Sequence, residues 1–420
     1  MKPIPLDDSS KNMKKGTPTR RSASTKPLLA RFTTHLSSAE QKRIIHGTLL
    51  VLFIVATIIV VRVNTLYSRI STRSGIDASP IPKEKKVFNL LVMGYGGPGH
   101  DGAYLTDTMM FASIDTEHKR VTLVSIPRDT WVRIPTTSGD EFARKINSVY
   151  QTGLFRKNYP DVPEKYDGVA GAGILLKETV ADIIGQDLDN YVAVDFSGFK
   201  QVVDTLGGVE VAVERSFTDP LYPIDGKETE LCGLAQDDLV GFEEKEKIAT
   251  ESPELAYPCR YELLHFTAGT QTMDGATALK FVRSRHSPED GGDFNRARRQ
   301  QLFIEALRDR VLSIGFLPKI PSLLNDLENN VRTDMPLELI QLLLKEAPHV
   351  KSYTISQVVL TTDNYMVDGY SDDGQYILTS KDGDFVWTSL KRDMKIYLDG
   401  KTPVTPIPTL SVSPIMKKSR

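Results

Sequence analysis

Three short apolar runs constrain the fold of this chain more than any other feature of its sequence. They cover residues 87–93, 108–114 and 121–126, and Gly, Asp or Pro bounds each one. Apolar runs of this length without polar alternation predict strands that are buried on both faces. A sheet of such strands needs a layer of helices on each side to exclude water.

Apolar residues at helical spacing supply those layers. Because strand and helix patterns alternate along the chain, we expect an α/β fold, an α-β-α layered domain built on a central mixed sheet. The expected helices cover residues 172–184, 198–205, 294–312 and 337–345, and the further strands cover residues 191–194, 209–213, 353–360, 376–379 and 385–387.

A second constraint is an uncharged apolar run at residues 44–61. A helix of that length spans about 27 Å, close to the hydrocarbon thickness of a bilayer. The run exceeds the core of a secretory signal, and no small-residue cleavage site follows it. We therefore expect one transmembrane helix over residues 44–66. A cleaved signal and a buried helix of a soluble domain are the alternatives.

Basic residues set the expected orientation of that helix. Residues 1–43 are rich in Lys, Arg, Ser, Thr and Pro, which predicts a disordered basic tail. The positive-inside rule places this tail in the cytoplasm and the rest of the chain outside. Arg62, Arg69 and Arg73 lie on the other side of the run and weigh against this orientation.

The remaining boundaries follow from composition. We expect an extended extracytoplasmic tether at residues 67–85, one folded domain at residues 86–400 and a disordered tail at residues 401–420. Within the domain, residues 217–262 have the prolines and the acidic run of a surface insertion. Cys232 and Cys259 in this insertion either form a disulfide or remain two thiols, and they lack the spacing of metal ligands.

Arginine residues concentrate near the end of the expected insertion. We predict a strand over residues 280–285, which would place Arg283 and Arg285 on one face. On the helix that follows, Arg296 and Gln300 stand four apart and share a face. Two elements would then direct guanidinium groups to one place, an arrangement suited to a phosphate dianion. The alternative is a set of surface charges paired with neighbouring Asp and Glu side chains.

Two further polar segments border the apolar runs. Arg128 and Asp129 follow the third run directly, where α/β sheets bind their ligands. Asp107 precedes the second run, and Asp101 lies in the glycine-rich loop before it. Carboxylates of this kind, together with phosphate oxygens, are the ligands that Mg²⁺ prefers. A turn or helix-cap role for either aspartate is the alternative.

Several reaction classes are excluded by what the sequence lacks. The loop at residues 94–102 has no Gly-Lys-Ser/Thr ending and precedes a strand, so we do not expect a nucleotide. The chain has no nucleophile elbow, no HExxH pair and no reactive-cysteine setting. Arginine, carboxylate and a metal ion remain, and they favour phosphoryl transfer through positioning and charge neutralisation.

Six ordered motifs resemble the LytR-CpsA-Psr family of cell-wall glycopolymer ligases. The resemblance covers residues 89–310 and continues more weakly to residue 398. The motifs lie at residues 89–94 (NLLVMG), 106–110 (TDTMM), 125–130 (SIPRDT), 145–147 (KIN), 203–209 (VDTLGGV) and 283–301.

The resemblance implies a site that grips the diphosphate of a polyprenyl carrier, with the lipid in an apolar tunnel within the fold. Mg²⁺ would bind at Asp107, with Asp101 as the second candidate ligand. The catalytic candidates are Arg128, Arg283, Arg285 and Asp129, and the candidate diphosphate ligands are Lys145, Arg296, Arg299 and Gln300.

Two positions depart from the family pattern. Gly96 stands where the family often has an aspartate on the metal side, and Leu105 stands where an arginine is usual. The expected function is a Mg²⁺-dependent extracytoplasmic phosphotransferase that moves a glycopolymer from a polyprenyl-diphosphate carrier to peptidoglycan.

Three alternatives to transfer remain open: a membrane-anchored module that only binds polyprenyl phosphates, a polyprenyl-diphosphate hydrolase, and control of transcription. Residues 1–43 contain no helix-turn-helix pattern, so we expect no nucleic-acid partner.

Overall fold

The structure is a computed structural model that describes residues 57, 61–72, 84–100, 102–233, 257–313, 328–346, 349 and 352–401. Residues 63–420 form one compact unit, which contains nearly all of the described residues. Residues 1–62 form a second unit, of which only residues 57, 61 and 62 are described. The elements below all belong to the first of these units.

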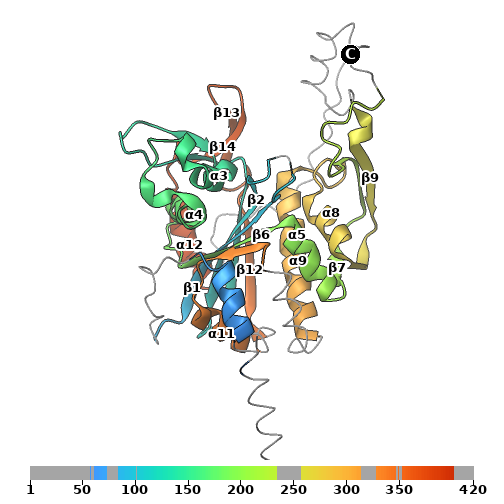
Figure 1. Cartoon of the computed structure of the whole chain (residues 1–420), viewed down its shortest axis with the longest axis horizontal. Helices are drawn as coiled ribbons and strands as arrows, with labels where there is room; N and C mark the ends of the chain where they lie inside the picture. Colours follow the sequence, from blue (N-terminus) through green and yellow to red (C-terminus); the bar gives the residue numbers. More distant parts are fainter. Residues whose placement is uncertain are drawn as a thin grey trace, which may run out of the picture. The chain divides into compact units, whose positions relative to one another are not determined.

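A six-stranded sheet forms the centre of the unit (Figure 1). β1 pairs in parallel with β6 and antiparallel with β2, and β3 pairs in parallel with β12, so the sheet is mixed as expected. In order across the sheet, the strands are β11 (Val331–Thr333), β6 (Asn190–Asp195), β1 (Val87–Tyr95), β2 (Thr106–Asp115), β3 (Arg120–Ile126) and β12 (Thr354–Val359).

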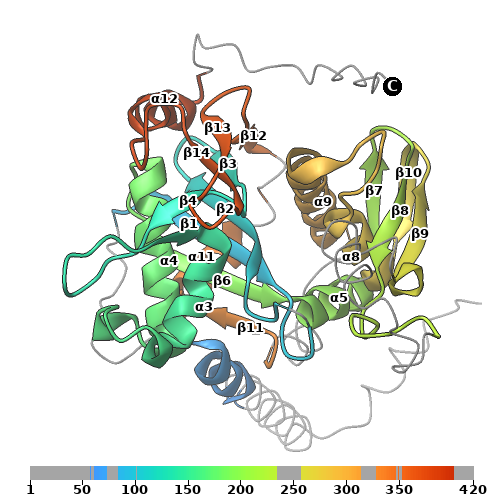
Figure 2. The ribbon, with the colours of Figure 1, turned by 90° about the horizontal axis from the view of Figure 1, so that it is seen from above.

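Helices on one face bury the largest apolar cluster. α4 (Gly168–Ile184) and α12 (Thr388–Leu398) pack against this face, and α3 (Val149–Leu154) packs against α4 (Figure 2). Alternate residues Leu91 and Met93 of β1 point into this cluster, and both are fully buried. β1 is therefore buried on this face, as its apolar run predicts.

Helices also cover the opposite face, which confirms the α-β-α layering. Phe88 and Leu90 pack there against Leu339 of α11 (Leu337–Glu346). The long helix α9 (Gly292–Ser313) contacts both β12 of the central sheet and β7 (Val209–Val213).

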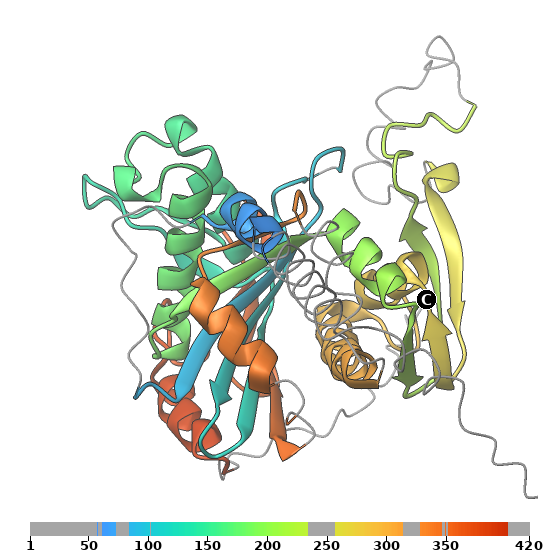
Figure 3. The same cartoon turned by 60° about the horizontal axis from the view of Figure 1, so that its bottom comes forward.

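A second cluster holds α5 (Phe196–Thr205), α8 (Gly275–Arg283) and the strands beyond them together (Figure 3). Phe217, Phe266 and Phe281 form its aromatic centre, with ring centroids 5.1 to 6.1 Å apart. The strands of this layer pair as β7 with β10 (Gly269–Met273) and as β8 (Phe217–Pro223) with β9 (Tyr261–Phe266).

Short elements complete the unit. Two hairpins pair β4 (Trp131–Arg133) with β5 (Ala143–Lys145) and β13 (Met366–Tyr370) with β14 (Tyr376–Ser380). The 3-10 helices are η1 (Ile146–Ser148), η2 (Arg156–Asn158), η3 (Glu164–Tyr166) and η5 (Pro258–Arg260).

The strand expected at residues 280–285 is wrong. These residues belong to helix α8 as far as Arg283, and the chain then leaves the helix. The Asp274 side chain accepts a hydrogen bond of 2.8 Å from the Thr277 N–H and caps this helix. Its buried residues Ala278, Leu279, Phe281 and Val282 follow the helical spacing rather than strand alternation.

Two other expectations need correction. Residues 385–387 are not a strand, because they lead directly into α12, which the sequence reading missed. The expected insertion begins with a strand of the fold, since β8 pairs with β9. The Cys232–Cys259 disulfide is present, with a Cα–Cα distance of 5.4 Å. Residues 234–256 of the insertion lie outside the described residues.

The segment before the domain is helical where it is described. Residues 63–70 of this unit are helical, and Leu66 and Ile70 are buried. The Tyr67 hydroxyl donates a 3.1 Å hydrogen bond to the Met335 carbonyl, and Ser71 bridges to Thr333. The tether expected at residues 67–85 is therefore not extended at its start, because the helix packs on the domain.

Several expectations for the two ends of the chain lie outside the described residues. They are the tail at residues 1–43, most of the transmembrane run, residues 73–83 of the tether and the tail after residue 401. Among the helices that the structure describes, none combines the length and the apolar character that crossing a membrane requires.

Candidate functional site

One cavity opens where several strands of the central sheet end. Gly94 at the end of β1, Asp195 at the end of β6 and Asp107 at the start of β2 all line it, and Arg128 after β3 lines it as well. Because β2 runs antiparallel to β1 and β3, its first residues meet the last residues of its neighbours. The cavity has a volume of about 520 Å³, within the usual range for ligand sites.

The cavity has an apolar wall and a charged wall. Helices α5, α8 and α9 supply most of the apolar residues, and α9 also supplies charged ones. The apolar lining residues are Val92, Met93, Val194, Phe196, Phe199, Val202, Val203, Pro223, Leu279, Val282, Phe303, Ile304 and Leu307. The charged and amide lining residues include Asp107, Arg128, Arg283, Arg285, Arg296 and Gln300.

Arg128 is surrounded by carboxylates. Its Nη1 donates a 2.9 Å hydrogen bond to Asp107 Oδ1, and its Nε lies 3.5 Å from Asp129 and 4.0 Å from Asp293. Burial lowers the pKa of Arg128, but Asp107 and Asp293 outweigh it and the pKa lies above its ordinary value. The Nε atom is buried and has no hydrogen-bond partner among the described residues, so only the Asp129 and Asp293 carboxylates lie near it.

Asp129 and Lys145 stand behind Arg128. Lys145 Nζ donates a 2.8 Å hydrogen bond to Asp129 Oδ1, and Asp129 is buried. The Asp129 carbonyl accepts a 2.9 Å hydrogen bond from the Leu378 N–H. Neither Asp129 nor Lys145 lines the cavity, so the structure places this pair as a support for Arg128 and not among the groups that face a ligand.

Arg296 and Gln300 of α9 reach the same wall, as their spacing predicts. Arg296 is buried, and its Nη2 lies 3.0 Å from Asp293 Oδ1 and 3.2 Å from the Asp107 carbonyl. Burial lowers the pKa of Arg296, and the positive charge of Arg128 lowers it further. Gln300 Nε2 donates a 2.8 Å hydrogen bond to Thr108 Oγ1.

Arg283 approaches from the other side of the cavity. Its guanidinium carbon lies 4.2 Å from the centroid of the Phe196 ring, a cation–π contact. Its Nη1 lies 3.1 Å from the Tyr222 hydroxyl and 3.2 Å from Asp225 Oδ1. Burial raises the pKa of Tyr222 to about 12, so this hydroxyl is neutral at pH 7.

Arg285 lines the cavity with a half-buried side chain, and no hydrogen bond or ion pair joins its guanidinium to another described residue. Its backbone is held by Asp219, which is fully buried. Asp219 Oδ2 accepts hydrogen bonds of 2.6 Å from the Ser284 hydroxyl, 3.0 Å from the Arg285 N–H and 3.1 Å from the His286 N–H. The arginine that is most available to a ligand therefore sits on a backbone fixed by one buried carboxylate.

Arg299 does not belong to this group. It does not line the cavity, and its guanidinium carbon lies 4.8 Å from the centroid of the Phe217 ring. Its side chain donates to the Phe281 carbonyl at 3.0 Å, to the Ser284 carbonyl and to the Asp290 carboxylate at 2.6 Å. Contacts within the chain satisfy it, so its placement does not support the predicted diphosphate role.

The two predicted Mg²⁺ ligands, Asp107 and Asp101, differ in what the structure says of them. Asp107 lines the cavity and pairs with Arg128 through Oδ1, while no hydrogen bond among the described residues uses its Oδ2. Asp101 lies outside the described residues. One carboxylate oxygen that faces a cavity beside arginines fits a Mg²⁺ ion that takes its other ligands from phosphate and water.

Four residues of the cavity region were not predicted from the sequence. Phe196, Asp219, Tyr222 and Asp225 orient Arg283 or the backbone of Arg285, and His100 lines the same cavity. The first four lie outside the motifs: Phe196 follows β6, Asp219 and Tyr222 lie within β8, and Asp225 follows β8. Because Pro220 and Pro223 interrupt β8, its sequence has no clean strand alternation that could have revealed these residues.

Comparisons with known proteins agree with this geometry. The model of the LytR_cpsA_psr family matches residues 61–392. The chain is 28% identical over 286 residues to the polyisoprenyl-teichoic acid–peptidoglycan teichoic acid transferase TagU of Oceanobacillus iheyensis, covering 67% of this chain and 71% of that protein.

A second relative is TagV of Bacillus subtilis, which carries the same transferase name. It is 28% identical over 267 residues, and the match covers 63% of this chain and 54% of TagV, about half of its length. The crystal structure of the protein gbs0355 from Streptococcus agalactiae has the same fold, with a TM-score of 0.51 and 19% identity over 77% of this chain and 92% of that one. Because the family model covers well over half of the sequence, the chain belongs to the LytR_cpsA_psr family.

Proposed function

We propose that this protein is a phosphotransferase that moves a glycopolymer from a polyprenyl-diphosphate carrier to peptidoglycan. One observation carries the proposal: Arg128, Arg283, Arg285 and Arg296 line a single cavity whose lining is otherwise largely apolar. An isoprenoid diphosphate has the matching halves, a lipid chain and a compact anion. The relatives named as polyisoprenyl-teichoic acid–peptidoglycan teichoic acid transferases support the same reaction class.

The arginines divide the work of holding the anion. Arg128 and Arg296 are already engaged with Asp107 and Asp293, so they are fixed in place before a ligand arrives. Arg283 is oriented by an aromatic ring, and the Arg285 guanidinium has no partner among the described residues. Fixed donors that are aimed at developing charge lower a barrier because they need no reorganisation during the reaction.

The chemistry needs no covalent intermediate. A peptidoglycan hydroxyl attacks the phosphorus that bears the sugar and the phosphoanhydride bond breaks. Polyprenyl phosphate leaves with the bonding electron pair, and the hydroxyl proton passes to solvent water. Negative charge grows on the bridging oxygen that becomes part of the leaving group. The Arg285 guanidinium, which lines the cavity and has no partner among the described residues, is the donor best placed to stabilise that charge.

We assign Asp107 as the carboxylate that would hold Mg²⁺. The ion would supply further neutralisation of the diphosphate oxygens. Arg128 then has a second role, because its hydrogen bond to Asp107 Oδ1 orients the carboxylate so that Oδ2 is left for the ion.

The proposed location is the outer face of the cell membrane, with the N-terminus in the cytoplasm. The uncharged run at residues 44–61 and the basic residues before it support this topology. The lipid carrier lies in the membrane, and peptidoglycan lies on the wall side of it. An anchor beside the domain would therefore bring the cavity to the carrier. The disulfide between Cys232 and Cys259 is in keeping with an oxidising exterior.

The decisive experiment is a transfer assay. Full-length protein in detergent, lipid-linked donor, peptidoglycan and Mg²⁺ are incubated, and both released polyprenyl phosphate and glycan on the sacculus are measured. We expect stoichiometric appearance of the two products with the wild-type protein. Loss of transfer in Arg285→Ala and its retention in Arg298→Ala would support the assignment, since Arg298 lies on α9 but outside the cavity.

The same assay separates the two alternatives. A hydrolase releases polyprenyl phosphate at the same rate without peptidoglycan, whereas a transferase requires the acceptor. A module that only binds lipid retains the donor and releases nothing. Either outcome with the wild-type protein, at a Mg²⁺ concentration that supports transfer by a family relative, contradicts the proposal.

A further inference from the structure

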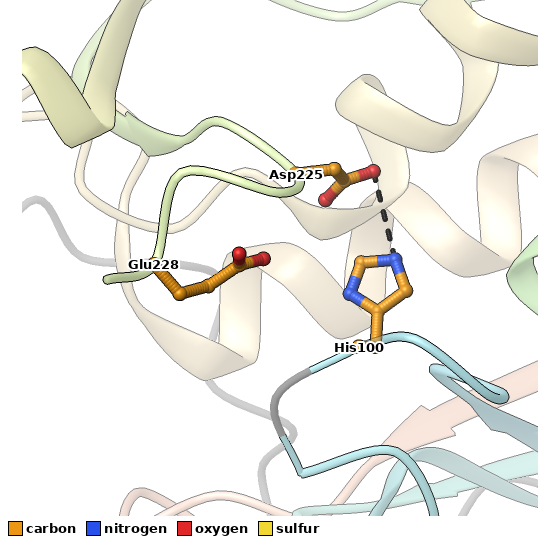
Figure 4. Close-up of side chains that lie close together, drawn as sticks. All are labelled: His100, Asp225 and Glu228. Atoms are coloured by element: carbon orange, nitrogen blue, oxygen red, sulfur yellow. Dashed lines mark ion pairs between the residues drawn. The ribbon is translucent and has the colours of Figure 1, made fainter. Parts of the chain in front are cut away.

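A histidine and two carboxylates meet at the rim of the cavity (Figure 4). His100 comes from the loop after β1, and Asp225 and Glu228 come from the loop after β8. One donor atom from each lies within 4.8 Å of the others, and His100 Nε2 is 3.6 Å from Asp225 Oδ2. All three residues line the cavity. Two loops far apart in sequence therefore present three metal-ligating side chains to one point.

Each of the three side chains is held by its own contact. The His100 ring packs edge-on against Phe196, with ring centroids 5.0 Å apart. Asp225 uses Oδ1 for Arg283 at 3.2 Å, which leaves Oδ2 directed at His100. Glu228 Oε1 accepts a 3.0 Å hydrogen bond from the Gly226 N–H. The donors are thus partly ordered before any ion binds.

The loop that carries both carboxylates is tied down on either side. The Arg260 carbonyl accepts a 2.8 Å hydrogen bond from the Ile224 N–H, and Arg260 Nε donates at 2.7 Å to the Glu230 carbonyl. The disulfide at Cys232 fixes the same loop to Cys259. A loop of this kind loses little conformational entropy when it closes on a cation.

The other loop leaves room for the imidazole. A Cβ atom built on Gly96 would lie 2.9 Å from His100 Cβ, closer than real Cβ contacts. Any larger residue at position 96 would therefore displace His100 from the cluster. The glycine is what allows the histidine to stand opposite the two carboxylates.

Charge and spacing are compatible with a metal site. The two carboxylates carry two negative charges, and Arg283 is the cation that pairs with Asp225. Around a Zn²⁺ ion with bonds of about 2.1 Å, neighbouring donors stand about 3.4 Å apart. The His100–Asp225 separation already matches this value, and Glu228 needs only a rotation of its flexible side chain.

We propose that His100, Asp225 and Glu228 bind one divalent transition-metal ion, with Zn²⁺ or Mn²⁺ preferred to Mg²⁺. An imidazole nitrogen favours these ions over Mg²⁺, which takes oxygen ligands and keeps its water. The donor set is distinct from Asp107. Because Asp225 joins the ion to Arg283, an occupied site would also fix that arginine over Phe196.

The test is metal binding, which needs neither donor lipid nor peptidoglycan. Full-length protein in detergent, purified with a tag that contains no histidine and stripped with a chelator, is titrated calorimetrically with ZnCl₂ and with MnCl₂. We expect saturation at one ion per chain in the presence of excess MgCl₂. His100→Ala, Glu228→Gln and Gly96→Ala should each weaken binding at least about 10-fold.

Two variants serve as controls. His118→Ala removes a histidine that pairs with Asp115 on another edge of the sheet, and Asp107→Asn removes the proposed Mg²⁺ ligand. Both should bind Zn²⁺ as the wild-type protein does. The absence of saturable Zn²⁺ and Mn²⁺ binding, or wild-type affinity in His100→Ala, would overturn the inference. Neither result bears on whether the protein transfers a glycopolymer, because the proposed function rests on the arginines.

Discussion

Two walls of the same cavity hold their arginines in different ways. On the sheet-edge wall, Arg128 and Arg296 are enclosed by the carboxylates of Asp107, Asp129 and Asp293. On the wall formed after α8, Arg283 rests on an aromatic ring and Arg285 has no side-chain partner among the described residues. The arginines of the first wall are held in place before a ligand binds. On the second wall, the positive charge of Arg285 is available to a ligand.

Two arginines of α9 show that the position of a residue in a motif does not by itself determine its role. Arg296 and Arg299 stand three apart on α9, and both are buried. Arg296 lines the cavity and pairs with the Asp293 carboxylate. Arg299 instead pairs with Asp290 and donates hydrogen bonds to two backbone carbonyls. Substitution of Arg296 should therefore affect the reaction, whereas substitution of Arg299 should affect the stability of the fold.

The largest expected effect separates these two helical arginines. Arg299→Ala leaves the Asp290 carboxylate and the Phe281 and Ser284 carbonyls without their donor. Breaking a buried pair costs about 3–5 kcal/mol, and we expect the free energy of unfolding to fall by that amount. Denaturant titration followed by tryptophan fluorescence measures it. A variant with the wild-type midpoint would contradict the structural role of Arg299.

The next effect concerns Arg285, on the opposite wall. Its side chain makes no hydrogen bond or ion pair with another described residue, so Arg285→Ala should leave the unfolding midpoint unchanged. Removing one preorganised donor costs about 10²- to 10³-fold in kcat, which the transfer assay measures. Arg298→Ala is the matched control, because Arg298 pairs with Glu214 and Gln357 away from the cavity. Equal loss in both variants would show that the walls do not differ as described.

A smaller effect is expected at Asp107, on the sheet-edge wall. Asp107→Asn keeps an acceptor for Arg128 but removes the charge that would hold Mg²⁺. The apparent Mg²⁺ affinity in the transfer assay should fall by about 10- to 100-fold, while saturating Mg²⁺ restores part of the rate. An unchanged Mg²⁺ dependence would remove Asp107 as the metal ligand. Chelation of all divalent ions should stop transfer in the wild-type protein.

The smallest effect is a pH dependence of stability at the end of β6. Burial raises the pKa of Asp195 above its ordinary value of 3.8, although the Gly198 and Ser197 N–H groups oppose the shift. A carboxyl with a raised pKa in the folded state stabilises fully below pH 3.8, and that contribution is lost as pH rises through the folded pKa. Asp195→Asn keeps the cap without this titration. Its unfolding midpoint should rise relative to the wild-type protein from pH 3.5 to 7, and parallel curves would contradict the assignment.

The sheet-edge wall could largely be predicted from the sequence. The three apolar runs form β1, β2 and β3, and Asp107 and Arg128 lie where the strand ends place them. This succeeded because apolar runs and strand ends are local features. Arg296 and Gln300 followed from helical spacing in the same way, and both line the cavity.

The opposite wall could not be predicted to the same extent. The strand expected for Arg283 and Arg285 is a helix and a following loop, since Asp274 caps α8. The direction of Arg283 depends on Phe196, Tyr222 and Asp225, which come from other segments. The pairing of β8 with β9 places the buried Asp219 carboxylate beside Ser284. Sequence periodicity does not reveal a long-range contact of this kind. Arg299 looked like its neighbours because the carbonyls and the carboxylate that satisfy it come from other segments and have no local signature.

The central claim is that the arginines of both walls grip the diphosphate of an isoprenoid carried in the apolar part of the cavity. The most direct measurement is binding of polyprenyl diphosphate to full-length wild-type, Arg285→Ala and Arg298→Ala proteins in detergent, with bound lipid quantified by mass spectrometry. The account predicts one lipid per chain for the wild-type protein and for Arg298→Ala, and at least about 10-fold weaker binding for Arg285→Ala, which corresponds to about 1.4 kcal/mol. Equal binding by all three proteins, or no bound isoprenoid in any of them, would contradict it.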